Sequence, residues 1–343
     1  MYIENKLIKK QLSIWMLFMF FLVSLIIIIG GLTRLTDSGL SITEWELFKG
    51  FIPPLNHEQM KLYFELYKQI PEYKLQNFSM NLSEFKVIFW WEWSHRFIAR
   101  IIGILYLIPL IYFTYILGFK KVKYLYFIFF LICFQGLIGW FMVSSGLTNR
   151  VDVSHFRLSI HLLFAFLILS LLLFNYLNFR VEKNISIKLN PFLPLSFLIL
   201  IFFQIIIGAF VSGMDAGKIY NSWPLMGSSY FPDDNNFEDL FKFSAFSDPS
   251  LVQFIHRNLA YVISIFYLSI LIIIYKKKMN NLYKTINILG FILVLQIFLG
   301  ILTVIYGAQI YIASVHQISS IFLVSICIYF YYINTRSNLQ LSN

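Results

Sequence analysis

Six histidines are the residues of this sequence best suited to chemistry, because most of them lie in or at the ends of long apolar runs. His57 lies in a polar stretch, and the other five are His95, His155, His161, His256 and His316. Ionisable side chains at membrane depth are costly and mark functional sites by default. Two neutral imidazoles facing each other across a four-helix bundle are a natural axial pair for heme iron, and imidazole also binds zinc or copper. Zinc is disfavoured, because no cysteine or second carboxylate completes a tetrahedral set. Without a metal, these histidines would hydrogen bond between helices.

An internal repeat sorts the histidines into pairs. His95-Arg96 recurs 161 residues later as His256-Arg257. The same offset relates Gln135, Gly139, Val143 and Gly146 to Gln296, Gly300, Val304 and Gly307. The glycines are interpreted as sites where helix backbones approach closely. Each half of the chain is therefore expected to supply one histidine pair.

The second half pairs His256 with His316, whereas the first half offers two partners for His95. The 161-residue offset maps His155 onto His316, but depth in the membrane favours His161. Six residues along a helix turn a side chain through about 600°, so the two rings point about 120° apart and do not share one iron.

Glu92 distinguishes the two halves. It lies three residues before His95, on the same helix face, and Gln253 occupies the corresponding position of the second half. A carboxylate beside one site and an amide beside the other suggests proton-coupled chemistry at the first and a permanent cofactor at the second. The alternative for Glu92 is an ion pair with Arg96 at i+4.

The elements that must position these residues are membrane helices. The 343 residues are 59% hydrophobic and only 13% charged, about half the charge of a soluble domain. A soluble enzyme, a disordered protein and a disulfide-stapled domain are excluded. The sequence predicts an all-α polytopic membrane protein with eight transmembrane helices, at about 13–33, 87–117, 124–146, 156–178, 191–212, 251–275, 285–307 and 311–333.

The basic residues give the orientation. Of the 27 Lys and Arg, 14 lie at the N-terminus, in the 118–123, 179–190 and 276–284 loops, and at Arg336, where the only acids are Glu4 and Glu182. By the positive-inside rule both termini face the cytoplasm, and the large loops 34–86 and 213–250 face outward. The net charge of +10 is thus a topology signal and gives no indication of nucleic-acid binding. A short interfacial helix is expected around His57–Tyr67, and little regular structure in the second loop.

The repeat also predicts the domain organisation. Residues 1–180 would form an N-terminal four-helix bundle with the outer loop 34–86, and residues 181–343 a C-terminal bundle with the outer loop 213–250. Because each half has an even number of spans, the two would enter the membrane in the same orientation. They would be related by a pseudo-twofold axis along the membrane normal.

Over essentially its whole length, the chain resembles the heme A synthase family, in its proteobacterial and mitochondrial branch. The resemblance rests on Gly30-Gly31-Leu32-Thr33-Arg34-Leu35-Thr36 with Ser38-Gly39-Leu40-Ser41, Glu92-Trp93-Ser94-His95-Arg96, Arg157-Leu158-x-x-His161-Leu162, Gly208-Ala209-Phe210-Val211-Ser212-Gly213-Met214-Asp215-Ala216-Gly217 with Trp223-Pro224, His256-Arg257, and Ser314-Val315-His316-Gln317.

The resemblance implies an oxidoreductase acting on a methyl group, which oxidises the ring methyl of heme O to a formyl group by successive hydroxylations. Heme b would lie between His256 and His316, and the substrate heme O between His95 and a histidine of the fourth span. The Arg-Leu-x-x-His-Leu pattern of the family assigns the latter role to His161, and His155 departs from it. Glu92 would be the catalytic carboxylate.

Further expectations follow from this resemblance. Guanidinium groups suit the heme propionates, and the candidates are Arg34, Arg96, Arg100 and Arg257. The protein would lie in the bacterial inner membrane, with heme O synthase, cytochrome oxidase assembly factors and a second copy of the chain as candidate partners. Two other functions share the histidine pairs: a di-heme b-type membrane electron carrier, which does not need Glu92, and a heme transporter or chaperone.

Overall fold

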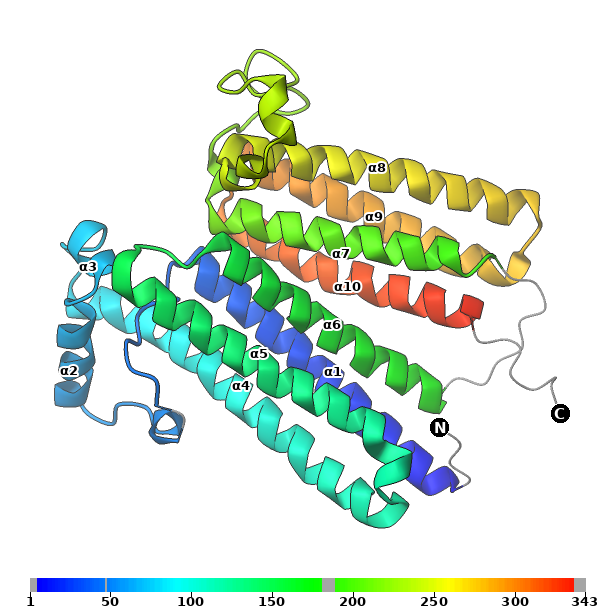
Figure 1. The fold of residues 1–343 in the computed structure, drawn as a ribbon, viewed down its shortest axis with the longest axis horizontal. Coiled ribbons are helices and arrows are strands. Elements are labelled where there is room, and N and C mark those ends of the chain that lie inside the picture. Colours follow the sequence, from blue (N-terminus) through cyan, green and yellow to red (C-terminus); the bar gives the residue numbers. More distant parts are fainter. Residues whose placement is uncertain (1–4, 47, 181–188, 336–343) are drawn as a thin grey trace. The chain divides into compact units, whose positions relative to one another are not determined.

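The computed structural model describes residues 5–46, 48–180 and 189–335, and its regular structure is almost entirely helical (Figure 1). Among these residues, eight helices are long and apolar enough to cross a membrane. They are α1 (Lys6–Leu35), α4 (Leu82–Leu117), α5 (Phe119–Asn149), α6 (His155–Arg180), α7 (Phe192–Gly213), α8 (Pro249–Lys276), α9 (Asn280–Ile305) and α10 (Ile310–Thr335). The prediction of an all-α polytopic membrane protein is confirmed.

The chain divides into two compact units. We call Phe21–Ile168 the N-terminal unit, and Met1–Phe20 with Leu169–Asn343 the C-terminal unit. The division between the two compact units falls inside α1 and α6. The domain boundary between residues 180 and 181, which the sequence repeat indicates, remains a prediction. Several charges used for the orientation, at Glu4, Glu182, Lys183, Lys188 and Arg336, lie outside the described residues.

In the N-terminal unit, α4 and α5 form a hairpin. Asn81 begins α4 with a capping box, in which its side chain accepts from the backbone of Glu84 and the Glu84 side chain accepts from the backbone of Asn81. Gly118 separates the two helices with a φ of +79°, a conformation that glycine adopts without steric cost. These local signals place the start of α4, three turns before Glu92 and His95.

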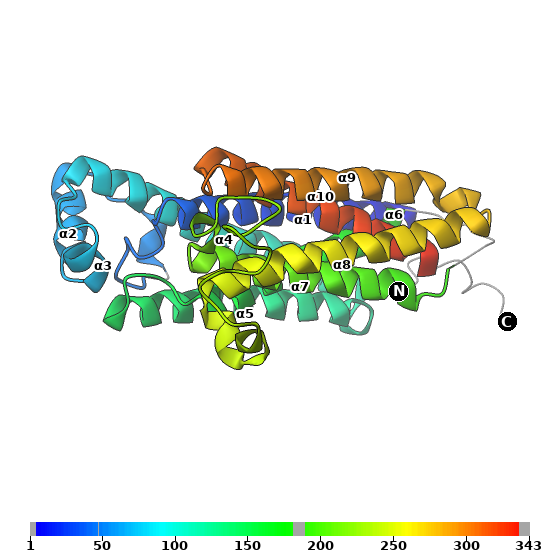
Figure 2. The ribbon, with the colours of Figure 1, turned by 90° about the horizontal axis from the view of Figure 1, so that it is seen from above.

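The first outer loop contains the short 3-10 helix η1 (Lys49–Phe51), α2 (His57–Tyr67) and α3 (Pro71–Leu75). The helix expected around His57–Tyr67 is present as α2, and Asn56 caps it by accepting from Gln59 N. An aromatic cluster joins α2 to the start of α4, with ring centroids 5.0–5.9 Å apart in Phe64–Phe85, Tyr67–Phe85 and Phe85–Phe89. The loop is therefore anchored on the helix that carries Glu92 and His95 (Figure 2).

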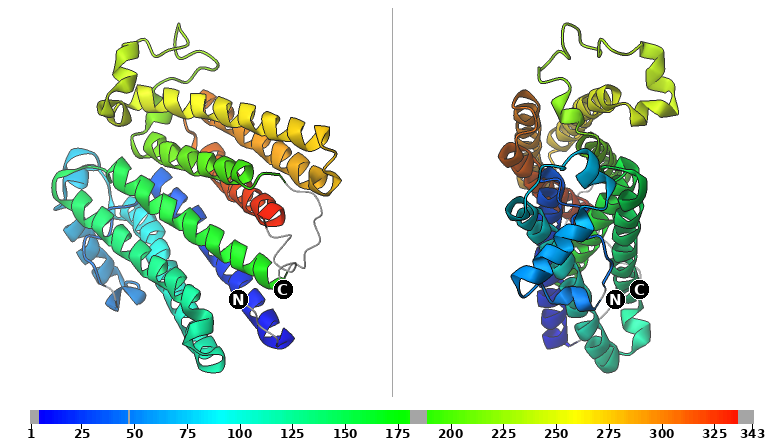
Figure 3. Two further views of the ribbon diagram at one scale, coloured as in Figure 1. Left: turned by 45° about the vertical axis from the view of Figure 1, so that its right-hand side comes forward. Right: turned by 90° about the vertical axis from the view of Figure 1, so that its left-hand side faces the viewer.

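In the C-terminal unit, α7 contacts α8 and α10, and α9 contacts α8 and α10. Asp248 caps α8 by accepting from Leu251 N, and Pro249 occupies the first helical position, where no N–H is needed. The loop between α7 and α8 holds three short 3-10 helices, η2 (Ala216–Lys218), η3 (Phe237–Phe241) and η4 (Phe243–Ser247), and is otherwise irregular, as its composition predicts (Figure 3).

Candidate functional site

Four histidines share one structural setting: the ring of each lies against a glycine on the long helix that precedes its own. A Cβ added to the glycine would lie 3.0–3.1 Å from the ring, closer than nearly all real Cβ contacts. The pairs are Gly30 on α1 with His95 on α4, Gly139 on α5 with His161 on α6, Gly208 on α7 with His256 on α8, and Gly300 on α9 with His316 on α10. Glycine at these four positions therefore leaves room for an imidazole between two helices, and we call these four residues the cradle glycines.

In the N-terminal unit, His95 and His161 face each other. Their ring centroids are 6.4 Å apart, and the ring planes are inclined by 60°. Two metal–nitrogen bonds of about 2 Å, with about 1.2 Å more from each nitrogen to its ring centre, separate two axial imidazoles by about 6 to 6.5 Å. The observed separation therefore fits two ligands of one heme iron.

In the C-terminal unit, His256 on α8 and His316 on α10 occupy the corresponding glycine cradles. The Nδ1 atoms of His161 and His256 are buried, and neither has a hydrogen-bond partner among the described residues. In the same part of the chain, no three His, Cys, Asp or Glu side chains converge to hold a bare metal ion. A heme iron needs only two axial protein ligands, so these pairs fit heme better than a bare ion.

The structure distinguishes the two candidates of the first half. His161 faces His95, whereas His155 is the first residue of α6 and its ring packs on Phe156 with centroids 4.2 Å apart. The 161-residue offset misleads here, because the first half has six more residues between the cradle glycine and the histidine of its last helix. His161, rather than His155, is the structural counterpart of His316.

Three glutamines hold the histidine-bearing helices. Each donates its Nε2–H to the backbone carbonyl of a histidine, at 2.8 Å for Gln135 to His161, 3.0 Å for Gln204 to His256 and 3.0 Å for Gln296 to His316. In every case the glutamine lies four residues before the cradle glycine, one helical turn away on the same face.

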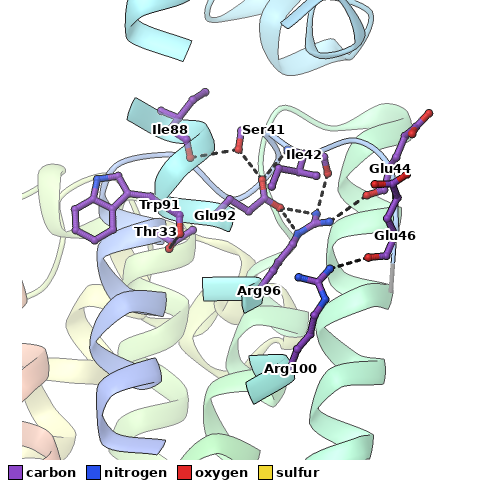
Figure 4. Close-up of polar contacts among 10 residues, drawn as sticks. All are labelled: Thr33, Ser41, Ile42, Glu44, Glu46, Ile88, Trp91, Glu92, Arg96 and Arg100. Atoms are coloured by element: carbon purple, nitrogen blue, oxygen red, sulfur yellow. Dashed lines mark hydrogen bonds and ion pairs between the residues drawn. The ribbon is translucent and has the colours of Figure 1, made fainter. Parts of the chain in front are cut away.

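Glu92 is 3% exposed, and both of its carboxylate oxygens accept hydrogen bonds (Figure 4). Its Oε1 accepts from Arg96 at 3.0 Å from Nε and 2.6 Å from Nη2. Its Oε2 accepts from Ser41 Oγ and from the backbone N–H of Ile42, both at 2.7 Å. The ion pair with Arg96 considered in the sequence is thus present, and it anchors the start of the first outer loop to α4.

Two arginines of α4 bind this loop. Arg96 also donates to the carbonyls of Ile42 at 2.8 Å and Glu44 at 3.2 Å. Arg100 donates to the carbonyls of Glu46 at 2.8 Å and Gly50 at 3.2 Å (Figure 4). Separately, Arg34 forms an ion pair of 2.6 Å with Asp37.

The C-terminal unit anchors its outer loop in the same way, with side chains of α8 that donate to backbone carbonyls of the loop, but without a carboxylate. We call each of these arginine-centred anchors a loop clamp. Gln253, 2% exposed, donates to the carbonyl of Tyr220 at 3.0 Å. Arg257 donates to the carbonyls of Tyr220 and Ser222, both at 2.9 Å. The buried Arg257 Nε and Gln253 Oε1 have no hydrogen-bond partner in the described part of the chain.

Sequence reasoning missed two features of the site. Gln204 belongs to the glutamine set, and its four-residue spacing to Gly208 was the available signal. Glu72 on α3 is 3% exposed and its Oε2 lacks a hydrogen-bond partner among the described residues. Burial, followed by the negative charges of Glu92, Asp37 and Asp152, raises the pKa of Glu72 to about 8. No sequence pattern marks a buried glutamate on a five-residue helix.

Eight apolar helices that carry four glycine-cradled histidines define a polytopic membrane protein. The cytochrome oxidase assembly protein family matches residues 13–328. Heme A synthase of Pelagibacter ubique (strain HTCC1062) is 48% identical over 330 residues, covering 95% of this chain and 97% of that protein. Heme A synthases of Rickettsia bellii (strain RML369-C) and Rickettsia felis (strain ATCC VR-1525 / URRWXCal2) are 39% and 40% identical, over 94% and 95% of this chain and 98% of each relative. The chain belongs to the heme A synthase family, as its motifs suggested.

Proposed function

We propose that this protein oxidises a ring methyl of heme O to a formyl group and so produces heme A for cytochrome oxidase. The observation that carries the proposal is the facing pair of His95 and His161, 6.4 Å apart, with a buried carboxylate three residues from one of them. Relatives named heme A synthase, which match nearly the whole chain, support the same reaction.

The two units take different roles in this proposal. Heme O, the substrate, binds between His95 and His161 in the N-terminal unit. Heme b is the resident cofactor between His256 and His316, where two glycine cradles and a buried ring nitrogen without a partner fit an iron ligand pair. When bound, heme b supplies a one-electron acceptor.

Glu92 is the proposed proton acceptor. With water as the oxygen source, the half-reaction is R–CH3 + H2O → R–CHO + 4 H+ + 4 e−, by way of a hydroxymethyl group and a gem-diol that loses water. The four electrons leave one at a time through the one-electron acceptor to an external oxidant. The protons need a base within reach of the substrate. Glu92 lies on the same helix face as His95, and Arg96 and Ser41 hold its two oxygens in a defined orientation.

We extend the proposal to the orientation in the membrane. By the positive-inside rule, the basic segments favour both termini in the cytoplasm of a bacterial cell and both large loops in the periplasm. The heme propionates then face the loops. The buried Arg257 Nε, without a partner in the described part of the chain, is a candidate donor to one of them. Heme O synthase and cytochrome oxidase assembly factors are the proposed partners for delivery and acceptance of heme.

The test separates chemistry from loop anchoring. Full-length protein is produced with a heme O source, its heme is extracted, and heme A is quantified by chromatography alongside total heme per protein. Glu92→Gln, which removes the base, is expected to keep bound heme but to lower heme A formation by a factor of about 100 or more, the usual contribution of a general base. Arg96→Lys keeps a cation beside the carboxylate and serves as the control for loop anchoring.

Three results would contradict the proposal or a part of it. Wild-type protein that binds heme O yet yields no formyl heme would favour the electron-carrier interpretation of the same histidine pairs. Glu92→Gln protein with wild-type heme A yield would remove Glu92 from the chemistry. Equal losses in Glu92→Gln and Arg96→Lys would assign Glu92 to loop anchoring instead.

A further inference from the structure

The glutamine contacts make three of the four histidines firmly held. A helix carbonyl has a second lone pair, which can accept a hydrogen bond in addition to the one within the helix. Gln135, Gln204 and Gln296 use it to tie the backbone of a histidine to the neighbouring helix. The Nε2 atom of Gln204 also lies 3.3 Å from His256 Nε2, and that of Gln296 lies 3.4 Å from His316 Nδ1. Displacing the ring of His256 or His316 disturbs such a contact, whereas the glutamine of His161 holds the backbone of that residue alone.

His95 lacks this support. Four residues before its cradle glycine, Gly30, the chain has Ile26, an apolar residue that cannot donate a hydrogen bond. Ile26 and Gln204 are 178 residues apart, as are Gly30 and Gly208, so Ile26 occupies the position that Gln204 has in the C-terminal unit. The N-terminal unit therefore departs from the repeat at the one histidine that stands beside Glu92.

The ring of His95 is also turned differently. A Cβ on Gly30 would meet Nε2 of His95 first, at 3.1 Å, and then Cδ2. At the other three cradles the nearest ring atom is Cε1, at 3.0–3.1 Å, followed by Nδ1. The ring orientation thus separates His95 from the three glutamine-supported histidines, in agreement with the missing glutamine.

We propose that His95 is the exchangeable ligand of the substrate heme, whereas the ligands with a glutamine contact stay bound. This inference rests on the proposed function. A substrate heme must enter its site and leave as product, so at least one axial bond of that site forms and breaks in every cycle. A resident cofactor needs no such release, and both of its histidines carry the glutamine contact. Ile26 is accordingly a positioning residue, because it leaves the backbone carbonyl of His95 without the glutamine hydrogen bond that the other three histidines have.

Carbon monoxide tests this inference without any turnover. It binds a six-coordinate ferrous heme only after one axial imidazole has left, so its binding rate reports ligand release. Full-length protein loaded with heme in lipid nanodiscs is reduced and mixed with carbon monoxide in a stopped-flow instrument. Two phases are expected, a fast one from the N-terminal unit and a slow one from the C-terminal unit.

The variants assign the phases. Ile26→Gln is expected to slow the fast phase about five- to tenfold, the factor that one hydrogen bond typically carries, while Ile26→Leu leaves it unchanged. Gln296→Leu is expected to accelerate only the slow phase. Equal rates in Ile26→Gln and Ile26→Leu, or no effect of Gln296→Leu, would overturn the proposal.

Heme content gives a second measurement in case Ile26→Gln does not accumulate. Because His161 is the fixed ligand, His95→Ala should keep the heme of the N-terminal unit, whereas His161→Ala should lose it; the reverse order would refute the assignment. Both measurements use whichever heme is bound. If the protein makes no heme A, the proposed function fails while the difference between the ligands can still be observed.

Discussion

Replacing Glu72 by glutamine should remove a pH dependence from the first outer loop. Glu72 is buried on α3, and the acidic groups nearest to it, at Glu92, Asp37 and Asp152, are of like charge. Its pKa is raised from 4.5 to about 8, first by burial and then by these charges, while a hydrogen bond from Tyr67 opposes the shift.

The sign follows from proton binding. Between pH 4.5 and about 8 the folded loop keeps the Glu72 proton while the unfolded loop loses it, so loop stability falls as the pH rises through this window. Over the whole window the loss is on the order of 5 kcal/mol. Below pH 4.5 the group contributes no pH dependence, and above about 8 the loss is complete.

Amide hydrogen exchange over α2 and α3, corrected for the intrinsic pH dependence of exchange, measures this loss. Wild-type protection should fall by up to about tenfold per pH unit between pH 5 and 8. Glu72→Gln, which mimics the protonated side chain, should keep its pH 5 protection at pH 8. Glu58→Gln on the exposed side of α2, where the carboxylate side chain is 79% exposed, is the matched control and should behave as wild type. Parallel pH profiles for wild type and Glu72→Gln would refute the reasoning.

Three further predictions concern the ligand pairs and the clamps. Gly300→Ala puts a Cβ 3.0 Å from the ring of His316 and should shift or diminish the low-spin heme spectrum. Gly136→Ala, where a Cβ meets nothing within 4 Å, is the control and should leave the spectrum unchanged. Equal spectra for the two variants would contradict the role of Gly300 in accommodating the ring. His161→Ala should abolish heme A formation while His155→Ala retains it, scored by heme extraction; the opposite order would restore the partner indicated by the repeat offset. Arg257→Ala should release residues 220–225 and increase their cleavage by added protease, and an unchanged digestion pattern would show that the clamp is dispensable.

The fold could be predicted because a membrane leaves few choices. Runs of apolar residues must become helices there, and all eight spans appear, with ends that differ from the predicted ones by up to seven residues. The helix at His57–Tyr67 was also predictable, because its apolar positions follow the helical period. The arrangement of the second outer loop depends on side-chain contacts to backbone carbonyls, such as those of Arg257, which leave no periodic signal.

The site could be predicted only in its residue types. Histidines in apolar helices and the nearby carboxylate are conspicuous in the sequence, but the partner of His95 depends on the number of residues between helices. A repeat offset is reliable only until the first insertion, and six additional residues before His161 shift it. The role of the glycines as histidine cradles could not be read from the chain, since a glycine that accommodates a ring and one that accommodates a helix look alike.

The loop clamps indicate why a carboxylate at Glu92 matters. In both units an arginine binds equivalent carbonyls of the loop, Ile42 for Arg96 and Tyr220 for Arg257, so the clamp is common to the two copies. In the C-terminal unit the clamp works with the amide of Gln253, and loop anchoring therefore does not require a negative charge. The N-terminal unit differs from its copy both in this carboxylate and in the missing glutamine contact of His95. In our proposals one difference supplies a base and the other a releasable ligand, the two properties that a site with turnover needs and a site with a resident heme does not.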